Sequence, residues 1–201
     1  MEKRIAIMGG TFDPIHHGHL ITAEAVREAM DIGTMVFIPA AVPPHKLDRE
    51  VTPAEHRLRM TELATASNPH FRVSDIELRR QGPSYTIDTI RALQKQYPED
   101  TTFYFIIGAD AINELTTWHE VDTLITMCHF IAATRQGTSF DAEGLYARFG
   151  ERGRAHIHRA LTPHIEISST DIRSRVREGR SIRYLVPQVV REYIEKEGLY
   201  R

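Results

Sequence analysis

Apolar positions along the chain follow two alternating patterns. Continuous apolar runs at 4–8 and 35–38 end at Gly9-Gly10 and at Pro39, which is typical of buried strands in a parallel sheet. Between these runs, apolar residues recur at helical spacing from Gly18 to about Gly33. The same two patterns predict further strands at 71–78, 103–107, 130–133 and 165–167, and helices at 53–66, 86–97, 121–127, 169–178 and 187–197, with a short one after 110.

Strands that alternate with helices predict an α/β fold, here a Rossmann-like, mainly parallel sheet with helices on both faces. We expect 1–201 to form a single domain with a C-terminal helical portion from about 168; between 137 and 160 the pattern is weak and predicts no element. Thr52 and Pro53 have the form of a helix start, with a capping residue followed by proline.

Ligands of parallel α/β sheets bind beyond the carboxyl ends of the strands. Three unusual segments, 9–19, 108–110 and 167–173, lie at the ends of predicted strands. We therefore expect these segments to converge on one site.

Composition and charge narrow the function classes. With 41% hydrophobic and 26% charged residues, the chain is expected to bury a core, and its net charge of -2 argues against a broad nucleic-acid binder. No apolar stretch approaches the ~20 residues of a membrane span and no secretory signal follows Met1, so we expect a cytoplasmic protein with no membrane or nucleic-acid partner. Cys128 is the single cysteine, which excludes an internal disulfide and a cysteine-built zinc site and favours a small buried side chain.

One stretch departs from the overall charge balance. Between 148 and 183 the chain carries nine arginines and four acidic residues, which is a local excess of five positive charges. Such a run is usually a solvated surface. It is also a candidate region for holding an anionic small molecule.

Segment 9–19, GGTFDPIHHGH, combines two glycines with three histidines. It contains neither a G-x-G-x-x-G fingerprint nor a Walker A sequence, but glycines let a ligand approach the backbone, and a helix N-terminus offers free N–H groups. His16 and His19 are three residues apart at the start of a helix and so share one face, whereas His17 points elsewhere. They could be zinc ligands, although no third ligand is evident, or plain surface residues; we favour donors to an anion.

Segment 167–173, ISSTDIR, also places donors at the start of a predicted helix, in this case hydroxyl groups. Three hydroxyl side chains after a predicted strand can cap a helix and leave donors to spare, and Arg173 falls about one turn later on the same side as Ser169 or Thr170. An ordinary capped helix is the simplest interpretation of this segment alone. In an arginine-rich context it also suits a polyphosphate.

These residues carry a resemblance to a known family. GTFDPIHHGH resembles the first signature of the nucleotidyltransferase superfamily, with the HxGH core at 16–19, and ISSTDIR resembles its second signature, ISSTxIR. PPHK at 43–46, PSYTIDT at 83–89, GAD at 108–110 and the Trp118-His119 pair are similar to one branch, the bacterial nicotinate-nucleotide adenylyltransferases. The similarity covers nearly the whole chain, including the YLVPQVVREYI segment; 137–160 is the weakest match.

The resemblance implies adenylyl transfer from ATP to nicotinate mononucleotide, giving deamido-NAD and pyrophosphate. The attacking phosphate is already anionic, so the reaction needs alignment and charge relief rather than a general base. Mg²⁺ is expected on the ATP phosphates rather than in a protein cage, and a homo-oligomer is compatible with the sequence. The implied catalytic residues are His16, His19, Lys46 and Arg173.

The resemblance also implies two sets of binding residues. Trp118 would stack on the pyridine ring, or else serve local packing, and Asp110 would accept from ribose hydroxyls, or else cap a helix. The implied ATP-binding residues are Gly9, Gly10, Thr11, Phe12, His16, Gly18, His19, Gly108, Asp110, Arg135, Ile167, Ser168, Ser169, Thr170 and Arg173. The implied residues for the mononucleotide are Lys46, Ser84, Tyr85, Thr86, Gly108, Ala109, Asp110 and Trp118.

Two other functions fit parts of the sequence. The first signature also suits a sister enzyme, such as a pantetheine-phosphate adenylyltransferase or a cytidylyltransferase, and PSYTIDT with Trp118-His119 is what argues against it. A non-catalytic nucleotide sensor on the same fold is the other alternative. His16, His19, Lys46 and Arg173 argue against a sensor, which need not keep a transition-state clamp.

Overall fold

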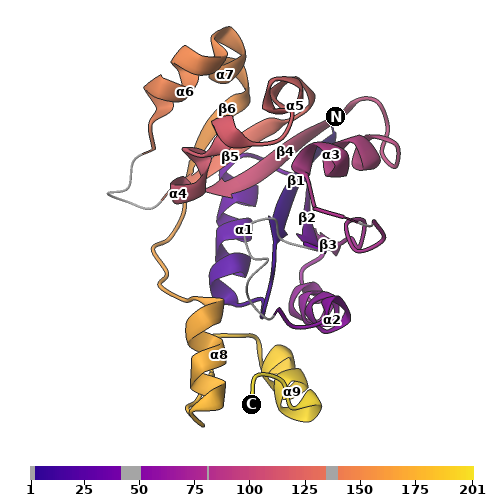
Figure 1. The fold of residues 1–201 in the computed structure, drawn as a ribbon, viewed down its shortest axis with the longest axis vertical. Helices are drawn as coiled ribbons and strands as arrows, with labels where there is room; N and C mark the ends of the chain where they lie inside the picture. The colour runs from indigo at the N-terminus through magenta and orange to yellow at the C-terminus, as the bar shows by residue number, and fades with distance from the viewer. Residues whose placement is uncertain (1–2, 42–50, 81, 135–139) are drawn as a thin grey trace.

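The computed structural model describes residues 3–41, 51–80, 82–134 and 140–201 and contains one six-stranded sheet (Figure 1). All the paired strands run parallel, in the order β3-β2-β1-β4-β5-β6. The order reverses between β1 and β4, which makes their shared edge the topological switch point of the sheet. The predicted Rossmann-like α/β class is confirmed. The strands are β1 (Lys3–Gly10), β2 (Thr34–Pro39), β3 (Phe71–Val73), β4 (Thr101–Gly108), β5 (His129–Thr134) and β6 (Ile157–Leu161).

Helices cover both faces of this sheet because its central strands are apolar on both sides. On β1, Ile5 and Ile7 pack on one face with α3 and α5, and Ala6 and Met8 pack on the other with α1, α2, α8 and α9. Figure 1 shows α8 and α9 together at one end of the molecule. The helices are α1 (His17–Ala29), α2 (Ala54–Thr65), α3 (Thr86–Gln94), α4 (Ala109–Ile112), α5 (Val121–Met127), α6 (Ala142–Phe149), α7 (Glu151–His156), α8 (Ser169–Arg177) and α9 (Gln188–Glu197), with a 3-10 turn, η1, at Leu115–Thr117.

The sequence predictions for strands were wrong in three places. The helices α6 and α7 and most of the edge strand β6 fall within 137–160, where no element was predicted. The strand β6 buries only Ile157 and Ala160 and so lacks a continuous apolar run. The strand predicted at 165–167 does not form, and that segment runs unpaired toward α8. The strand predicted at 71–78 ends at Val73, where the chain turns.

The start of α2 also differs from the prediction. The N-cap residue of the helix is Pro53 rather than Thr52, and no side chain caps this end. Instead, the backbone of Thr52 makes two contacts to distant residues, because its N–H donates to Asp13 and its carbonyl accepts from Arg57. A sequence that looks like a helix cap is therefore part of a long-range connection.

Cys128 is buried, as the sequence predicted, and burial raises the pKa of its thiol to about 12. A thiol with so high a pKa stays protonated at neutral pH, so Cys128 packs in the core and does not act as a nucleophile. Within the described residues, none of the helices is both long and apolar enough to cross a membrane.

Three histidines gather near the amino ends of β5 and β6. His129 Nδ1 and His158 Nε2 are 2.9 Å apart, and the His129 ring lies 4.4 Å from that of His156 and 4.9 Å from that of Tyr104. Burial and the neighbouring histidines lower the pKa of His129 to about 4. His129 therefore packs as a neutral ring.

This cluster predicts a loss of stability in acid. The unfolded chain binds more protons than the folded one between pH 6.5 and about 4, so the free energy of unfolding falls as pH is lowered through this window. Arg4, His156 and His158 all disfavour a charge on His129, and Tyr104 contributes only its ring. His129→Gln should reduce the acid-induced loss by about 1–2 kcal/mol, allowing for solvent screening of half-buried rings.

Urea unfolding at pH 7.0, 5.5 and 4.5 checks this expectation, with exposed His70→Gln as the matched control. The same pH dependence in His129→Gln as in the unaltered chain would contradict it.

Candidate active site

A cavity of about 510 Å³ opens at the carboxyl ends of β1 and β4. Its walls come from the three segments that were predicted to converge, and that convergence is confirmed. The cavity is lined by Met8, Gly9, Thr11, Asp13, His16, Gly18, His19, Thr22, Val51, Ile106, Gly108, Ala109, Ala133, Thr162, Pro163, Ile165, Ile167, Ser168, Ser169, Thr170 and Arg173.

The rings of His16 and His19 stack in this cavity, with centroids 3.7 Å apart. The backbone N–H of His16 donates to His19 Nδ1 at 3.3 Å, which places the proton of a neutral His19 ring on Nε2. Phe12 packs edge-on against His19 at 5.1 Å and holds the plane of its ring. The first motif thus presents an oriented imidazole whose Nε2 is a donor.

His16 is held as a neutral ring. It is 6% exposed, and burial, with a smaller effect of His17, lowers its pKa to about 4. Its Nδ1 is buried and makes no hydrogen bond within the described part of the chain. Gly18 allows the ring to lie this close to the helix, because a Cβ there would come within 3.0 Å of His16 Nδ1. A buried polar atom without a partner in a cavity wall suits a bound ligand.

The second motif starts α8 and is tied to the first. Ser168 caps the helix by accepting from the N–H of Asp171, as the hydroxyl run predicted. Ser169 Oγ donates to the Pro14 carbonyl at 2.9 Å. Arg173 donates to the carbonyl of Asp13 at 2.7 Å and, at 3.4 Å, to Thr170 Oγ1, which confirms that Arg173 and Thr170 share one side of the helix.

Arg57, on α2, is buried and holds backbone segments next to the cavity in place. Its side chain is 1% exposed, and its guanidinium donates to the carbonyls of Thr52 at 2.8 Å, Thr11 at 2.7 Å and Ala40 at 2.9 Å. Burial lowers the pKa of Arg57, and the charge of Asp13 opposes that shift. The guanidinium therefore fastens the ends of β1 and β2 to the start of α2.

Other predicted ATP-binding residues lie in three different places. Phe12 is buried under His19 and, like Gly10, does not line the cavity; a Cβ at Gly10 would come within 2.9 Å of the Phe12 ring, so Gly10 makes room for that ring. Asp110 lies in α4, whose N-cap is Gly108, so the capping alternative for Asp110 is wrong. Its side chain, together with Lys46 and Arg135, lies outside the described residues.

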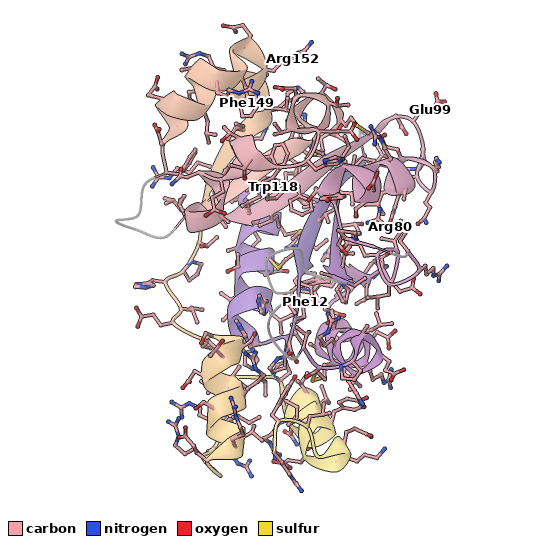
Figure 2. The ribbon with its side chains drawn as sticks, in the orientation of Figure 1. Phe12, Arg80, Glu99, Trp118, Phe149 and Arg152 are labelled. Atoms are coloured by element: carbon pink, nitrogen blue, oxygen red, sulfur yellow. The ribbon has the colours of Figure 1, made fainter. Side chains whose placement is uncertain are left out.

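Among the described residues predicted to bind the mononucleotide, Gly108 and Ala109 line this cavity, whereas Ser84, Tyr85, Thr86 and Trp118 do not. Ser84 Oγ accepts from the N–H of Ala41, which ties 83–86 to the end of β2. The Tyr85 ring stacks on His119 at 4.3 Å, and Thr86 is the first residue of α3. Figure 2 shows Trp118 beside β4 and β5, where it packs edge-on against Phe105 and Phe130.

Most of the arginine-rich stretch is used elsewhere. Arg148 pairs with Asp122, Arg175 with Asp171 and Arg180 with Glu178, each at 2.7–2.9 Å. Of the nine arginines from 148 to 183, Arg173 is the one that lines the described cavity. The stretch therefore marks the cavity only through Arg173, and three of its other arginines form ion pairs with acidic side chains outside the cavity lining.

Sequence reasoning missed two residues that hold the site together. Asp13 lies inside the first motif but was not singled out; it is 4% exposed and is the single carboxylate among the described lining residues. Arg57 shares the buried face of α2 with Met60, Thr61 and Ala64. An arginine at helical spacing with buried positions is the signal that could have found it.

The donor set of the cavity does not fit a metal ion held by the protein. The described walls offer imidazole, hydroxyl, guanidinium and backbone donors, and the Asp13 carboxylate already accepts from Thr52 and Tyr200. Within the described residues there is no group of three or more His, Cys, Asp or Glu arranged to hold a metal. Such walls suit an anion that brings its own counter-ion.

Comparison with known proteins agrees with this geometry. Residues 7–175 match the family model described as cytidylyltransferase-like. The chain is 52% identical over 199 residues to a probable nicotinate-nucleotide adenylyltransferase of Moorella thermoacetica, with 98% of this chain and 92% of that protein covered. It is 50% identical over 208 residues to the protein of that name from Thermoanaerobacter sp., with 100% and 95% covered.

A solved structure shares the fold. Plasmodium falciparum nicotinic acid mononucleotide adenylyltransferase, complexed with NaAD, superposes with a TM-score of 0.78 at 23% identity, covering 98% of this chain and 97% of that one. Near-complete coverage at about half identity by the bacterial relatives, together with both signatures around one cavity, establishes the family. The chain belongs to the nicotinate-nucleotide adenylyltransferase family.

Proposed function

We propose that this chain transfers the adenylyl group of ATP to nicotinate mononucleotide, in NAD biosynthesis. A phosphate oxygen of the mononucleotide attacks the α-phosphorus of ATP, a new P–O bond forms, and the bond to the departing pyrophosphate breaks. The observation that carries the proposal is the cavity in which the stacked His16 and His19 rings face the start of α8 and Arg173. Release of pyrophosphate from ATP only when nicotinate mononucleotide is present tests it.

Different residues of the cavity would bind different phosphates of ATP. Nε2–H of His19 would donate to the α-phosphate, with neutral His16 beside it. Arg173 would bind the β- and γ-phosphates, aided by the first N–H groups of α8 at Ser169 and Thr170. The Ser169 hydroxyl already donates to Pro14, so its backbone N–H is the group available for phosphate.

This arrangement favours the transition state without a proton transfer. Charge builds up on the α-phosphate and the leaving pyrophosphate, and donors fixed before the reaction stabilise it most. Mg²⁺ would neutralise part of that charge while bound by phosphate oxygens and water. As the family motifs indicate, Lys46 is proposed to assist at the phosphates and Asp110 to contact a ribose, and Arg135 is proposed as a further residue of the nucleotide site.

The mononucleotide would bind next to 83–86 and 118–119. Thr86 begins α3, so the first N–H groups of that helix are placed to receive a carboxylate. The carboxylates near these segments already have partners: Asp88 pairs with Arg91 at 3.5 Å, Glu77 accepts from Thr89 at 2.7 Å, and Glu120 pairs with Arg91 at 2.7 Å. Trp118 combines packing against Phe105 with a half-buried surface on which a pyridine ring could stack.

We further propose that 1–201 acts as one domain in the cytoplasm. Ile172 of α8 and Val190 and Ile194 of α9 belong to the same apolar cluster as Met8 of β1, which supports the single domain. A homo-oligomer stays a prediction.

His19→Ala should lower kcat by roughly 10²–10³, the usual cost of losing one donor to a developing charge. Thermal unfolding should change little, because His19 is half-buried at a polar helix end. His17→Ala, on the neighbouring residue outside the cavity lining, is the matched control and should keep normal turnover. Near-normal kcat in a folded His19→Ala protein would contradict the assigned role.

Arg173→Ala should weaken ATP binding by more than tenfold, which is about 1.4 kcal/mol or more for a charge-assisted contact, and should change mononucleotide binding far less. Arg173→Lys should restore the charge but not the fork geometry and so rescue only in part. Arg175→Ala removes a neighbouring arginine that pairs with Asp171 outside the cavity, and serves as control. Calorimetric dissociation constants for each ligand measure this; equal losses for both would point to a structural role.

We expect a strong preference for nicotinate over nicotinamide mononucleotide in kcat/KM. A carboxylate gains charge-assisted bonds from N–H donors, whereas an amide presents its own donors to them. Trp118→Ala should weaken both substrates by roughly 1–3 kcal/mol and leave their ratio unchanged, and Trp118→Phe, which keeps an aromatic ring, should recover part of the loss. Comparable efficiencies for acid and amide in the unaltered enzyme would refute the donor-pocket argument.

A further inference from the structure

Asp13 makes three contacts that connect distant parts of the chain. Its Oδ1 accepts from the Tyr200 hydroxyl at 2.7 Å, and its Oδ2 accepts from the Thr52 N–H at 3.2 Å. Its backbone carbonyl accepts from Arg173 NH1 at 2.7 Å. The residue that holds the Arg173 guanidinium is therefore itself held, through its side chain, by Tyr200.

Burial and several side-chain contacts hold Tyr200 in this position. Its hydroxyl also lies 4.0 Å from Met60 Sδ on α2, and its backbone has φ +65°, a left-handed conformation that is strained for a non-glycine residue. Burial and the Asp13 carboxylate raise the pKa of Tyr200, so the hydroxyl keeps its proton and remains a donor. A strained residue that persists is over-determined by its contacts, and here the polar contacts of the hydroxyl are the Asp13 carboxylate and the Thr52 side chain.

We propose that Tyr200 is a positioning residue for the adenylyl transfer, and that it acts through Asp13 to fix Arg173 against the phosphates of ATP. This inference rests on the role proposed above for Arg173. Without the Tyr200 hydroxyl, Asp13 loses a charge-assisted bond on Oδ1, and its backbone carbonyl no longer has one defined position for the guanidinium to meet. The phosphate end of ATP is the part of either substrate that depends on this chain of contacts.

The test compares two single-atom deletions. Tyr200→Phe removes the hydroxyl and keeps the ring that packs near Met60. Tyr193→Phe is the matched control: its hydroxyl, in α9, hydrogen-bonds His56 of α2 at 2.9 Å, so it also joins the end of the chain to α2, but away from the cavity. Dissociation constants for ATP and for nicotinate mononucleotide are measured separately by calorimetry, with Tm and kcat for each variant.

Tyr200→Phe is expected to weaken ATP binding roughly 3- to 10-fold, the range for loss of one hydrogen bond, and to leave mononucleotide binding unchanged. Tyr193→Phe should leave both unchanged. In an Arg173→Ala background, Tyr200→Phe should weaken ATP binding no further, because the residue through which it acts is gone.

Three outcomes overturn the inference alone: unchanged ATP binding in Tyr200→Phe, equal losses for both substrates, or a further loss in the Arg173→Ala background. Unchanged ATP binding in Arg173→Ala itself would overturn the proposed role of Arg173 and this inference with it. The two failures are therefore distinguishable.

Discussion

The geometry of the site depends on one buried charge, the guanidinium of Arg57. A charge that has left water must be matched by hydrogen bonds, and here the partners are backbone carbonyls at Thr11, Ala40 and Thr52. These carbonyls follow β1, follow β2 and precede α2. Moving any one of them leaves a buried donor without a partner, at a cost of about 1–3 kcal/mol. The ladder between β1 and β2 stops at Gly10 and Pro39, and Arg57 joins the residues just beyond it to the start of α2, so the cavity keeps its shape.

On that frame the chain places two stacked imidazole rings and one permanent cation. Two charged imidazoles 3.7 Å apart would repel each other, and burial keeps His16 neutral at physiological pH. Neutral donors bind ground-state phosphate weakly and gain strength as charge develops, which directs binding energy to the reacting centre. In the proposed reaction, Arg173 would supply the constant attraction that retains a polyanion. The histidines would therefore act mainly on turnover, and Arg173 mainly on the affinity for ATP.

The sequence predicts the parts of this structure that are encoded locally. The apolar runs of β1, β2, β4 and β5 locate the centre of the sheet, and the two motifs locate the site, because strand ends of a parallel sheet share one edge. The edge strand β6 escapes prediction since only Ile157 and Ala160 point inward. Thr52 was misjudged because a cap and a long-range acceptor look alike in sequence. The bonds of Asp13 and Arg57 join residues whose proximity exists only in the folded chain.

Those long-range bonds have a consequence for the order in which the protein acquires activity. Asp13 and Tyr200 are separated by 187 residues, Asp13 and Arg173 by 160, and Pro14 and Ser169 by 155. Closing such loops is entropically unfavourable until the intervening sheet has formed, so these contacts come last in folding and are the first to open. A newly made chain can hold a complete sheet and a finished first motif while its catalytic cavity does not yet exist.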